Sequence, residues 1–213
     1  MSGGIVVVKV GGAVVDTDLG SLENAVVVHG GGAQISKAMA DAGLEVSFVG
    51  GRRVTDDHAI VVVREALLQV NRELCAAIGP RAVGFAGDEI GLQATPVPEL
   101  GNVGIPVPSA PRAIVAALAS GKIPVVAPLA RGPLNVNADD AAAALAVGLG
   151  ATRILFMTDV PGVLRDEQVL DRIDAGEVES GEFDGGILPK LQAAVVAAKQ
   201  GVHAEIGRTV VVA

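Results

Sequence analysis

Aromatic residues are scarce, because the 213-residue sequence contains no tryptophan, no tyrosine and only four phenylalanines. Half of its residues are nevertheless hydrophobic, so the core must be built from aliphatic side chains, chiefly those of valine, alanine and leucine. A chain of this length can form one compact domain with a full core, or one domain with two lobes.

Long hydrophobic runs are also missing. A helix that crosses a membrane needs about 20 consecutive apolar residues, and Arg112, Lys122 and Arg131 interrupt the longest candidate region. Residues 1–12 lack the basic segment and long apolar stretch of a secretory signal peptide. Cys75 is the single cysteine, which excludes an internal disulfide. Together these absences predict a cytoplasmic protein with no membrane partner.

An excess of basic residues is absent as well. The 16 lysines and arginines are outnumbered by 24 aspartates and glutamates, which gives a formal net charge of -8. Because nucleic-acid-binding proteins usually carry a basic patch, this balance argues against a nucleic-acid partner. Small anionic substrates stay compatible with it, since local N–H groups and a few lysines can outweigh the global charge.

Short apolar runs alternate with helical patterns along the chain. The runs are rich in β-branched residues, as in buried parallel strands, and cover residues 5–10, 25–28, 123–127 and 154–157. Helices are expected over residues 55–78, 109–121, 138–149 and 189–200, and hairpin strands near 46–49 and 92–95. This alternation predicts an α/β sandwich.

Capping residues and loops can be assigned from the same pattern. Thr55 is expected to cap the helix that ends near residue 78, and Ser109 the helix that ends at Gly121. Proline and glycine are frequent in residues 96–111, which are interpreted as a surface loop. A second such stretch, residues 128–133, is interpreted as the place where two lobes could meet.

Two of the apolar runs end in glycines, in the phrases KVGG (residues 9–12) and HGGG (residues 29–32). Neither phrase fits a Walker A loop or the Rossmann pattern G-x-G-x-x-G. Glycines after a strand either form a tight turn or let backbone N–H groups approach an anion. His29 fits either proton transfer or a hydrogen-bonding role, and no histidines or cysteines have the spacing of a metal site.

Six phrases occur in order across nearly the whole chain: KVGG, HGGGAQI, GRRVTDD, LNVNADDAA, TDVPGVL and GGILPKLQAA. With this combination the sequence resembles the amino acid kinase family. The resemblance implies an α/β fold, an αβα sandwich around a mostly parallel open sheet, with a single domain over residues 1–213. It also implies a substrate lobe over about residues 1–133 and an ATP lobe over about residues 134–213.

The resemblance further implies transfer of the γ-phosphoryl group of ATP to the side-chain carboxylate of N-acetyl-L-glutamate, a step of arginine biosynthesis. Mg2+ would arrive with ATP, bound mostly by its phosphates. By the same resemblance Lys9 and Lys190 contact the phosphoryl group, and Asp139 holds both lysines by ion pairing. Backbone N–H groups for the phosphoryl group and the acceptor would come from Gly11, Gly12, Gly31 and Gly32.

The acceptor subsite is implied in the same way. Arg53 would pair with the α-carboxylate of the substrate through two parallel hydrogen bonds. Arg52 is expected to face solvent, although an exchange of roles between the two arginines stays open. Asn135 would bind the substrate, and Asn137 would bind it or cap the following helix. Asp140 is interpreted as an ordinary helix-start charge.

The phrase TDVPGV, residues 158–163, follows an apolar strand and resembles the nucleotide-binding loop of the family. The alternative is a plain strand-to-turn corner that contains Pro161. Under the first interpretation, ATP is bound by Thr158, Asp159, Val160, Gly162 and Val163.

The chain departs from the family in its length. Only about a dozen residues, within the segment 13–28, separate the two glycine corners, and no helix precedes the first strand. We therefore expect a homodimer without feedback by arginine. Two rival functions stay open. One is a kinase for aminoadipate or glutamate attached to a small acidic carrier protein, and the other is a non-catalytic nucleotide-binding regulator.

Overall fold

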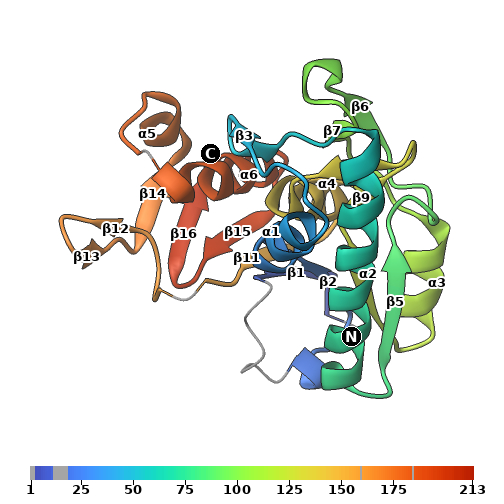
Figure 1. Ribbon diagram of the computed structural model, residues 1–213. Coiled ribbons are helices and arrows are strands. Elements are labelled where there is room, and N and C mark those ends of the chain that lie inside the picture. The colour runs from blue at the N-terminus through green and yellow to red at the C-terminus, as the bar shows by residue number, and fades with distance from the viewer. Residues whose placement is uncertain (1–2, 12–18, 159, 184) are drawn as a thin grey trace.

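The computed structural model describes residues 3–11, 19–158, 160–183 and 185–213 (Figure 1). Gly12 and Asp159, which were predicted to contact the substrate and ATP, lie outside the described residues. Within these ranges, no helix combines the length and the apolar character that a membrane crossing requires.

A large sheet forms the centre of the protein (Figure 1). Its strands are β1 (Val6–Val10), β2 (Ala25–His29), β5 (Ala82–Ala86), β8 (Ile123–Ala127), β11 (Arg153–Phe156), β14 (Arg172–Asp174), β15 (His203–Ile206) and β16 (Thr209–Val212). The strand order is β14-β16-β15-β11-β1-β2-β8-β5. The strands from β15 to β5 run parallel to one another, whereas β16 is antiparallel to β15.

The four strands predicted from apolar runs are confirmed as β1, β2, β8 and β11, within one residue at each end. All four lie inside the parallel part of the sheet and are therefore covered on both faces. A strand buried on both faces needs apolar side chains at every position, which explains why its sequence is a continuous run and does not alternate.

Shorter strands build the remaining sheets. A four-stranded sheet has the order β6-β7-β10-β9, with the bounds β6 (Ala94–Pro96), β7 (Val103–Pro106), β9 (Leu129–Ala130) and β10 (Leu134–Val136). The interpretation of residues 96–111 as a plain loop is therefore wrong. Pro106 is compatible with β7 because it lies at the end of the strand, where a missing N–H donor is tolerated.

Two small hairpins complete the strands: β3 (Phe48–Val49) pairs with β4 (Arg52–Arg53), and β12 (Leu164–Arg165) pairs with β13 (Gln168–Val169). The helices of the described residues are α1 (Gly32–Asp41), α2 (Asp57–Ile78), α3 (Arg112–Ala119), α4 (Ala138–Gly148), α5 (Ala175–Glu179) and α6 (Leu188–Lys199). The expected helices are thus confirmed as α2, α3, α4 and α6.

Helices cover both faces of the central sheet (Figure 1). Val7 and Val26 point to one face and belong to the hydrophobic cluster that includes the buried side of α4 and α6. Val8 and Val27 point to the other face, where they cluster with Leu74 of α2, and α1 packs on α2. The predicted αβα sandwich around a mostly parallel sheet is confirmed.

Two predicted helix caps are wrong. The side chain of Asp56 caps α2, accepting hydrogen bonds from two first-turn amides at 2.9 and 2.7 Å. Thr55 is instead fully buried and donates to the backbone oxygen of Arg53. α3 begins after Pro111 without a side-chain cap, and the buried hydroxyl of Ser109 has no hydrogen-bond partner among the described residues.

The order of the strands indicates where a ligand would bind. The chain places β2 on one side of β1 and later places β11 on the other side. In open sheets of parallel strands, ligands bind outside the carboxyl ends of the strands at such a switch point. Lys9 lies near the carboxyl end of β1, and β2 ends beside the start of α1.

Candidate active site

A cleft of about 200 Å³ opens at the carboxyl ends of β1 and β2. The N-termini of α1 and α4, the hairpin β3–β4 and the strand β10 surround it. Its lining includes seven residues that the sequence predicted for the site: Lys9, Gly31, Gly32, Arg53, Asn135, Asn137 and Asp139. Gly11 directly follows β1 but does not belong to the lining, and Gly12 lies outside the described residues.

Two lysines share one carboxylate at the cleft, where Lys9 and Asp139 belong to the lining and Lys190 does not. The Nζ atom of Lys9 lies 3.0 Å from Oδ1 of Asp139, and the Nζ atom of Lys190 lies 2.8 Å from the same oxygen. The three side chains are only 11%, 13% and 12% exposed, in the order Lys9, Asp139, Lys190. The structure thus joins β1, α4 and α6, distant in sequence, in one ion-pair cluster.

The electrostatics of the cluster leave one positive charge in excess. Burial lowers the pKa of Lys9; Asp139 raises it in opposition, and the nearby charge of Lys190 lowers it again. Lys190 also lies over the ring of Phe156, with its Nζ atom 5.6 Å from the ring centroid. Two ammonium groups with one carboxylate between them form a site for an anion such as a phosphate.

Replacing Lys9 with methionine is expected to change how stability depends on pH. Burial lowers the pKa of Lys9 in the folded state below its ordinary value of 10.5. At a pH between the lowered pKa of the folded state and the ordinary pKa of the unfolded chain, Lys9 is protonated in the unfolded chain and neutral in the folded one. The free energy of unfolding of the wild type therefore increases as the pH rises through this range. Urea denaturation from about pH 7 to about pH 10 should show the wild type gaining stability relative to Lys9→Met.

The control for this measurement is Lys37→Met, which removes an exposed lysine paired with Asp41 on α1. Its free energy of unfolding should run parallel to that of the wild type over the same pH range. A constant difference between wild type and Lys9→Met would show that burial does not shift Lys9.

Glycines open the side of the cleft formed by α1. Gly31 precedes the helix in an extended conformation, Gly32 is its first residue, and no side chain caps it. First-turn amides of a helix have no intrahelical partner and attract anions. At Gly32, a Cβ atom would find no atom within 4 Å, so the glycine leaves open space at this helix end.

Arg53 lies along the wall of the cleft. Its side chain donates to the backbone oxygen of Gly32 at 3.1 Å and to Oγ of Ser36 at 2.8 Å, and its guanidinium lies 4.6 Å from the ring centroid of Phe48. A guanidinium has five N–H donors, so these bonds orient the group and leave donors for a ligand. Ser36 and Phe48 were not predicted, because each contributes through this tertiary contact.

The two asparagines have different surroundings. Asn137 caps α4 through its side-chain oxygen, which accepts from the amides of Asp139 and Asp140 at 2.8 and 3.2 Å. Its predicted capping role is confirmed, and its contact with substrate stays a prediction. Asn135 donates to the hydroxyl of Thr55 at 3.1 Å. Thr55 therefore orients the side chain of Asn135, which is predicted to bind the substrate. The position of Thr55 next to Asp56 in the sequence did not indicate this contact.

The expectations for Arg52 and Asp140 are wrong. The Nη2 atom of Arg52 lies 2.6 Å from Oδ2 of Asp140, and the two side chains are only 29% and 20% exposed. Arg52 thus does not simply face solvent, and Asp140 is more than a helix-start charge. The pair joins residues 88 positions apart, so nothing in the local sequence indicated it.

The predicted nucleotide loop follows β11, the strand beside β1. Thr158 is half-buried and Val160 is 37% exposed, whereas Val163 is buried and donates its amide to the hydroxyl of Thr209 at 2.9 Å. A Cβ atom on Gly162 would lie 2.6 Å from the same hydroxyl, so only glycine fits there. None of these residues lines the cleft itself, and Asp159 lies outside the described residues.

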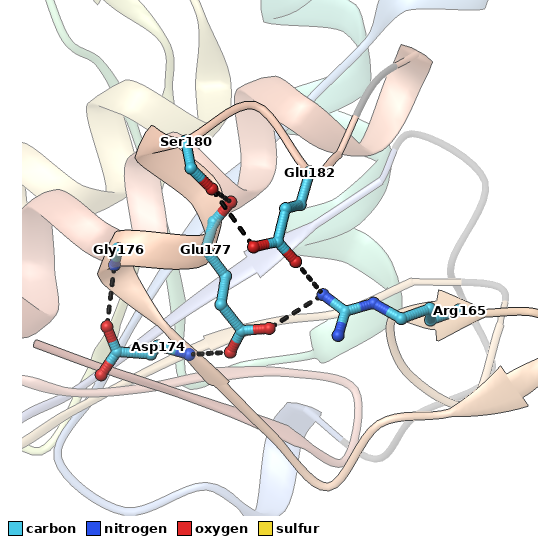
Figure 2. A network of polar contacts seen from close by, with 6 residues as sticks. All are labelled: Arg165, Asp174, Gly176, Glu177, Ser180 and Glu182. Carbon is cyan, nitrogen blue, oxygen red and sulfur yellow. Dashed lines mark hydrogen bonds and ion pairs between the residues drawn. The ribbon is translucent and has the colours of Figure 1, made fainter.

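A polar network beyond this loop connects the hairpin β12–β13 with α5 (Figure 2). Arg165 donates to Glu177 at 2.8 Å and to Glu182 at 3.1 Å. Glu177 also accepts from the backbone N–H of Asp174, completing a capping box at the start of α5. The guanidinium of Arg165 lies 5.0 Å from the centroid of Phe183. These contacts connect the hairpin to the segment that leads into α6.

The surroundings of His29 indicate a structural role and not one in proton transfer. It is fully buried, its Nδ1 atom lies 2.7 Å from the backbone oxygen of Gly30, and its Nε2 atom lies 3.1 Å from the side-chain nitrogen of Asn71. This arrangement assigns the proton to Nδ1. Burial lowers the pKa of His29, so the neutral ring supports the HGGG corner through hydrogen bonds.

The sequence of the chain matches a known protein family. The model of the amino acid kinase family matches residues 4–208, nearly the entire chain. The chain belongs to the amino acid kinase family. The match includes the whole lysine and aspartate cluster and the glycine corner HGGG, whose glycines line the cleft.

Several curated proteins similar to this chain are named acetylglutamate kinase. The acetylglutamate kinase of Rubrobacter xylanophilus is 44% identical over 223 residues, which cover 94% of this chain and 87% of that protein. The acetylglutamate kinase of Frankia alni is 42% identical over 200 residues. That alignment covers 83% of this chain but only 58% of the Frankia protein, so this chain spans little more than half of that relative.

Solved structures of the amino acid kinase family share the fold. The smu.665 protein of Streptococcus mutans has a TM-score of 0.83 at 29% identity, over 98% of both chains. The carbamate kinase of Giardia lamblia bound to AMP-PNP has a TM-score of 0.72 at 16% identity, over 100% of this chain and 99% of that one. At this lower identity the likeness concerns the fold alone.

Proposed function

We propose that the protein is an acetylglutamate kinase, which transfers the γ-phosphoryl group of ATP to the side-chain carboxylate of N-acetyl-L-glutamate in arginine biosynthesis. The observation that carries the proposal is the pair of ammonium groups of Lys9 and Lys190 that share Asp139 beside the cleft. The acetylglutamate kinases to which the chain is similar support the choice of acceptor.

In the proposed reaction, an oxygen of the acceptor carboxylate attacks the γ-phosphorus of ATP. The bond from that phosphorus to the bridging β–γ oxygen breaks, and ADP leaves with the electron pair. No proton has to move, so catalysis requires positioning and charge stabilisation. Lys9 and Lys190 neutralise charge on the phosphoryl oxygens, and Asp139 fixes their ammonium groups by accepting hydrogen bonds from both.

The acceptor would lie on the side of the cleft formed by α1 and β10. There Arg53 would bind its α-carboxylate, Asn135 its acyl amide, and the N–H groups of Gly31 and Gly32 the attacking carboxylate. Gly11 and Gly12 would approach the phosphoryl group from the end of β1. Hydrogen bonds hold Arg53 and Asn135 in place before the substrate arrives, and such preorganisation is the condition for strong electrostatic catalysis.

ATP would bind at the carboxyl end of β11, where Thr158, Asp159, Val160, Gly162 and Val163 are proposed to contact it. Mg2+ would bind through the phosphate oxygens. Among the described residues that line the cleft, Asp139 is the single carboxylate, and both lysines occupy it. The described residues also contain no group of three or more metal-ligating side chains. The metal would therefore neutralise phosphate charge alongside the lysines.

We further propose that the two parts of the single domain bind different substrates. Residues 1–133 would supply most of the acceptor side, joined by Asn135, and residues 134–213 most of the ATP side, with the central sheet continuous between them. We propose that the protein acts as a cytoplasmic homodimer without a nucleic-acid partner.

The test of this function is a coupled assay for ADP with a panel of acceptors. N-acetyl-L-glutamate is expected to support turnover well above that with N-acetyl-L-aspartate or free glutamate. Turnover only with glutamate or aminoadipate on an acidic carrier protein would replace the proposed substrate. Absence of ADP above background with every acceptor would indicate a nucleotide-binding regulator.

Replacing Arg53 with methionine is expected to raise KM for N-acetyl-L-glutamate by roughly 10- to 100-fold, because the charged hydrogen bonding of Arg53 to the α-carboxylate is lost. The KM for ATP should stay within about threefold of the wild-type value. Steady-state kinetics with one substrate varied at a time provides the comparison. Arg72→Met, which alters an exposed arginine of α2, serves as the control. A larger effect on ATP than on the acceptor would move Arg53 out of the acceptor subsite.

A further inference from the structure

The hairpin β3–β4 carries two consecutive arginines that point to different parts of the molecule. Arg53 lies against α1, whereas Arg52 reaches α4 and pairs with Asp140 at 2.6 Å, and both arginines belong to the lining of the cleft. Adjacent residues of a strand point to opposite sides, so the backbone of the hairpin fixes both directions at once. Displacement of one arginine would therefore displace the other.

The turn of the hairpin also approaches the second lysine. Gly51 lies beside the start of α6, where a Cβ atom on it would be 3.1 Å from Cγ of Pro189. Pro189 immediately precedes Lys190, and Asp140 immediately follows Asp139. The hairpin thus contacts the two helices that carry the charged cluster, next to the residues that form it.

Arg53 joins the hairpin to α1 and Gly51 lies against Pro189, but the strands of the hairpin themselves give it little support. Its two strands have two residues each and pair only with each other in the described sheets. Phe48 and Val49 are 55% and 58% exposed. An isolated two-stranded hairpin is marginally stable in water. The half-buried ion pair of Arg52 is therefore a principal tether between the hairpin and α4.

The charge of Asp140 gives the pair a second effect. Burial raises the pKa of Asp140, and Arg52 opposes that rise. A carboxylate without Arg52 would add negative charge beside a cleft that must accept two anionic substrates. Arg52 offsets this charge while it holds the hairpin in place.

We propose that Arg52 is a positioning residue for the acceptor, which acts through Asp140 to keep Arg53 and Phe48 against the acceptor subsite; this rests on the kinase function proposed above. The pair sets the affinity for the acceptor carboxylates more than the rate of phosphoryl transfer. Arg52 itself does not contact the reacting atoms in this role.

The test compares Arg52→Met with Arg52→Lys and with a matched control, Arg64→Met. Arg64 is likewise a half-buried arginine, 30% exposed, in an ion pair with Asp88 away from the cleft. Arg52→Met is expected to raise KM for N-acetyl-L-glutamate about tenfold, with kcat and KM for ATP within about threefold. Arg52→Lys should recover most of the affinity, and Arg64→Met should leave KM unchanged.

A double-mutant cycle with Asp140→Asn tests whether Arg52 acts through Asp140. If Arg52 acts through its ion pair with Asp140, the double variant Arg52→Met/Asp140→Asn should have nearly the same KM for N-acetyl-L-glutamate as Arg52→Met alone. Effects that multiply would show that the two residues act independently. An unchanged KM in Arg52→Met, with only a lowered Tm, would reduce the pair to a structural role. Either result overturns the proposal.

Hydrogen exchange separates this proposal from the kinase function. In the absence of substrates, amides of residues 47–54 should exchange at least about threefold faster in Arg52→Met than in wild type or Arg64→Met. This readout needs no turnover. A wild-type enzyme without kinase activity would overturn the function and with it the acceptor role, whereas unchanged exchange would overturn the tether alone.

Discussion

Replacing Lys190 with methionine is expected to lower kcat by roughly 10²- to 10³-fold, the range seen when one preorganised donor to a transition state is removed. Lys190 donates to Asp139 at 2.8 Å and is only 12% exposed, so its ammonium group is fixed before the substrates arrive. Methionine keeps much of the length of the side chain and removes the charge that the transferred phosphoryl group requires.

The control for this variant comes from the same helix. Lys199 lies at the other end of α6 and is 46% exposed in an ion pair with Glu179. Lys199→Met should keep kcat within about twofold of the wild-type value. Circular dichroism and gel filtration would establish that Lys190→Met folds. A folded variant with unchanged kcat would remove Lys190 from the phosphoryl site.

Replacing Asp139 with asparagine is expected to have two large effects. The first is loss of turnover by roughly 10²-fold or more, because neither lysine is held at the phosphoryl group. The second is a shift with pH. In the wild type Asp139 raises the pKa of Lys9, while burial and Lys190 lower it. Without the carboxylate, the pKa of Lys9 should fall further, and the remaining activity should be lost at a lower alkaline pH.

The pH–rate profiles of kcat for wild type and Asp139→Asn measure both of these kinetic effects.

The free energy of unfolding should also fall by about 3–5 kcal/mol in Asp139→Asn, since two buried ammonium groups lose their common partner. Asp41→Asn, which removes the exposed partner of Lys37, is the control and should preserve both the profile and the stability. An alkaline limb at the same pH in both enzymes would contradict the assigned role of Asp139.

The parts of the fold that could be predicted are those with a strong local signal. The runs that became β1, β2, β8 and β11 are apolar at nearly every position, because parallel strands are covered on both faces. The edge strands β5 and β14 were missed, as were β15 and β16 beside β14, and β7, whose sequence contains glycine and proline. The caps failed for a different reason. Thr55 and Asp56 are both good capping residues, and burial of Thr55 decided between them.

The site shows the same division. Lys9, Asp139 and Lys190 stand in phrases characteristic of the family, so the sequence could predict that they lie together, as the structure has them. The pair of Arg52 with Asp140 joins residues 88 positions apart, and the bond from Asn135 to Thr55 joins residues 80 positions apart. Such contacts depend on how the hairpin, β10 and α4 meet in space. No local pattern encodes them.

The most direct measurement follows oxygen from the acceptor into the product. N-acetyl-L-glutamate labelled with 18O in its side-chain carboxylate would be incubated with ATP and Mg2+, and the products observed by 31P NMR. The account predicts an acyl phosphate resonance that carries the 18O shift, in amounts equal to ADP, and no such resonance with the double variant Lys9→Met/Lys190→Met. ADP accompanied only by unlabelled inorganic phosphate would contradict it.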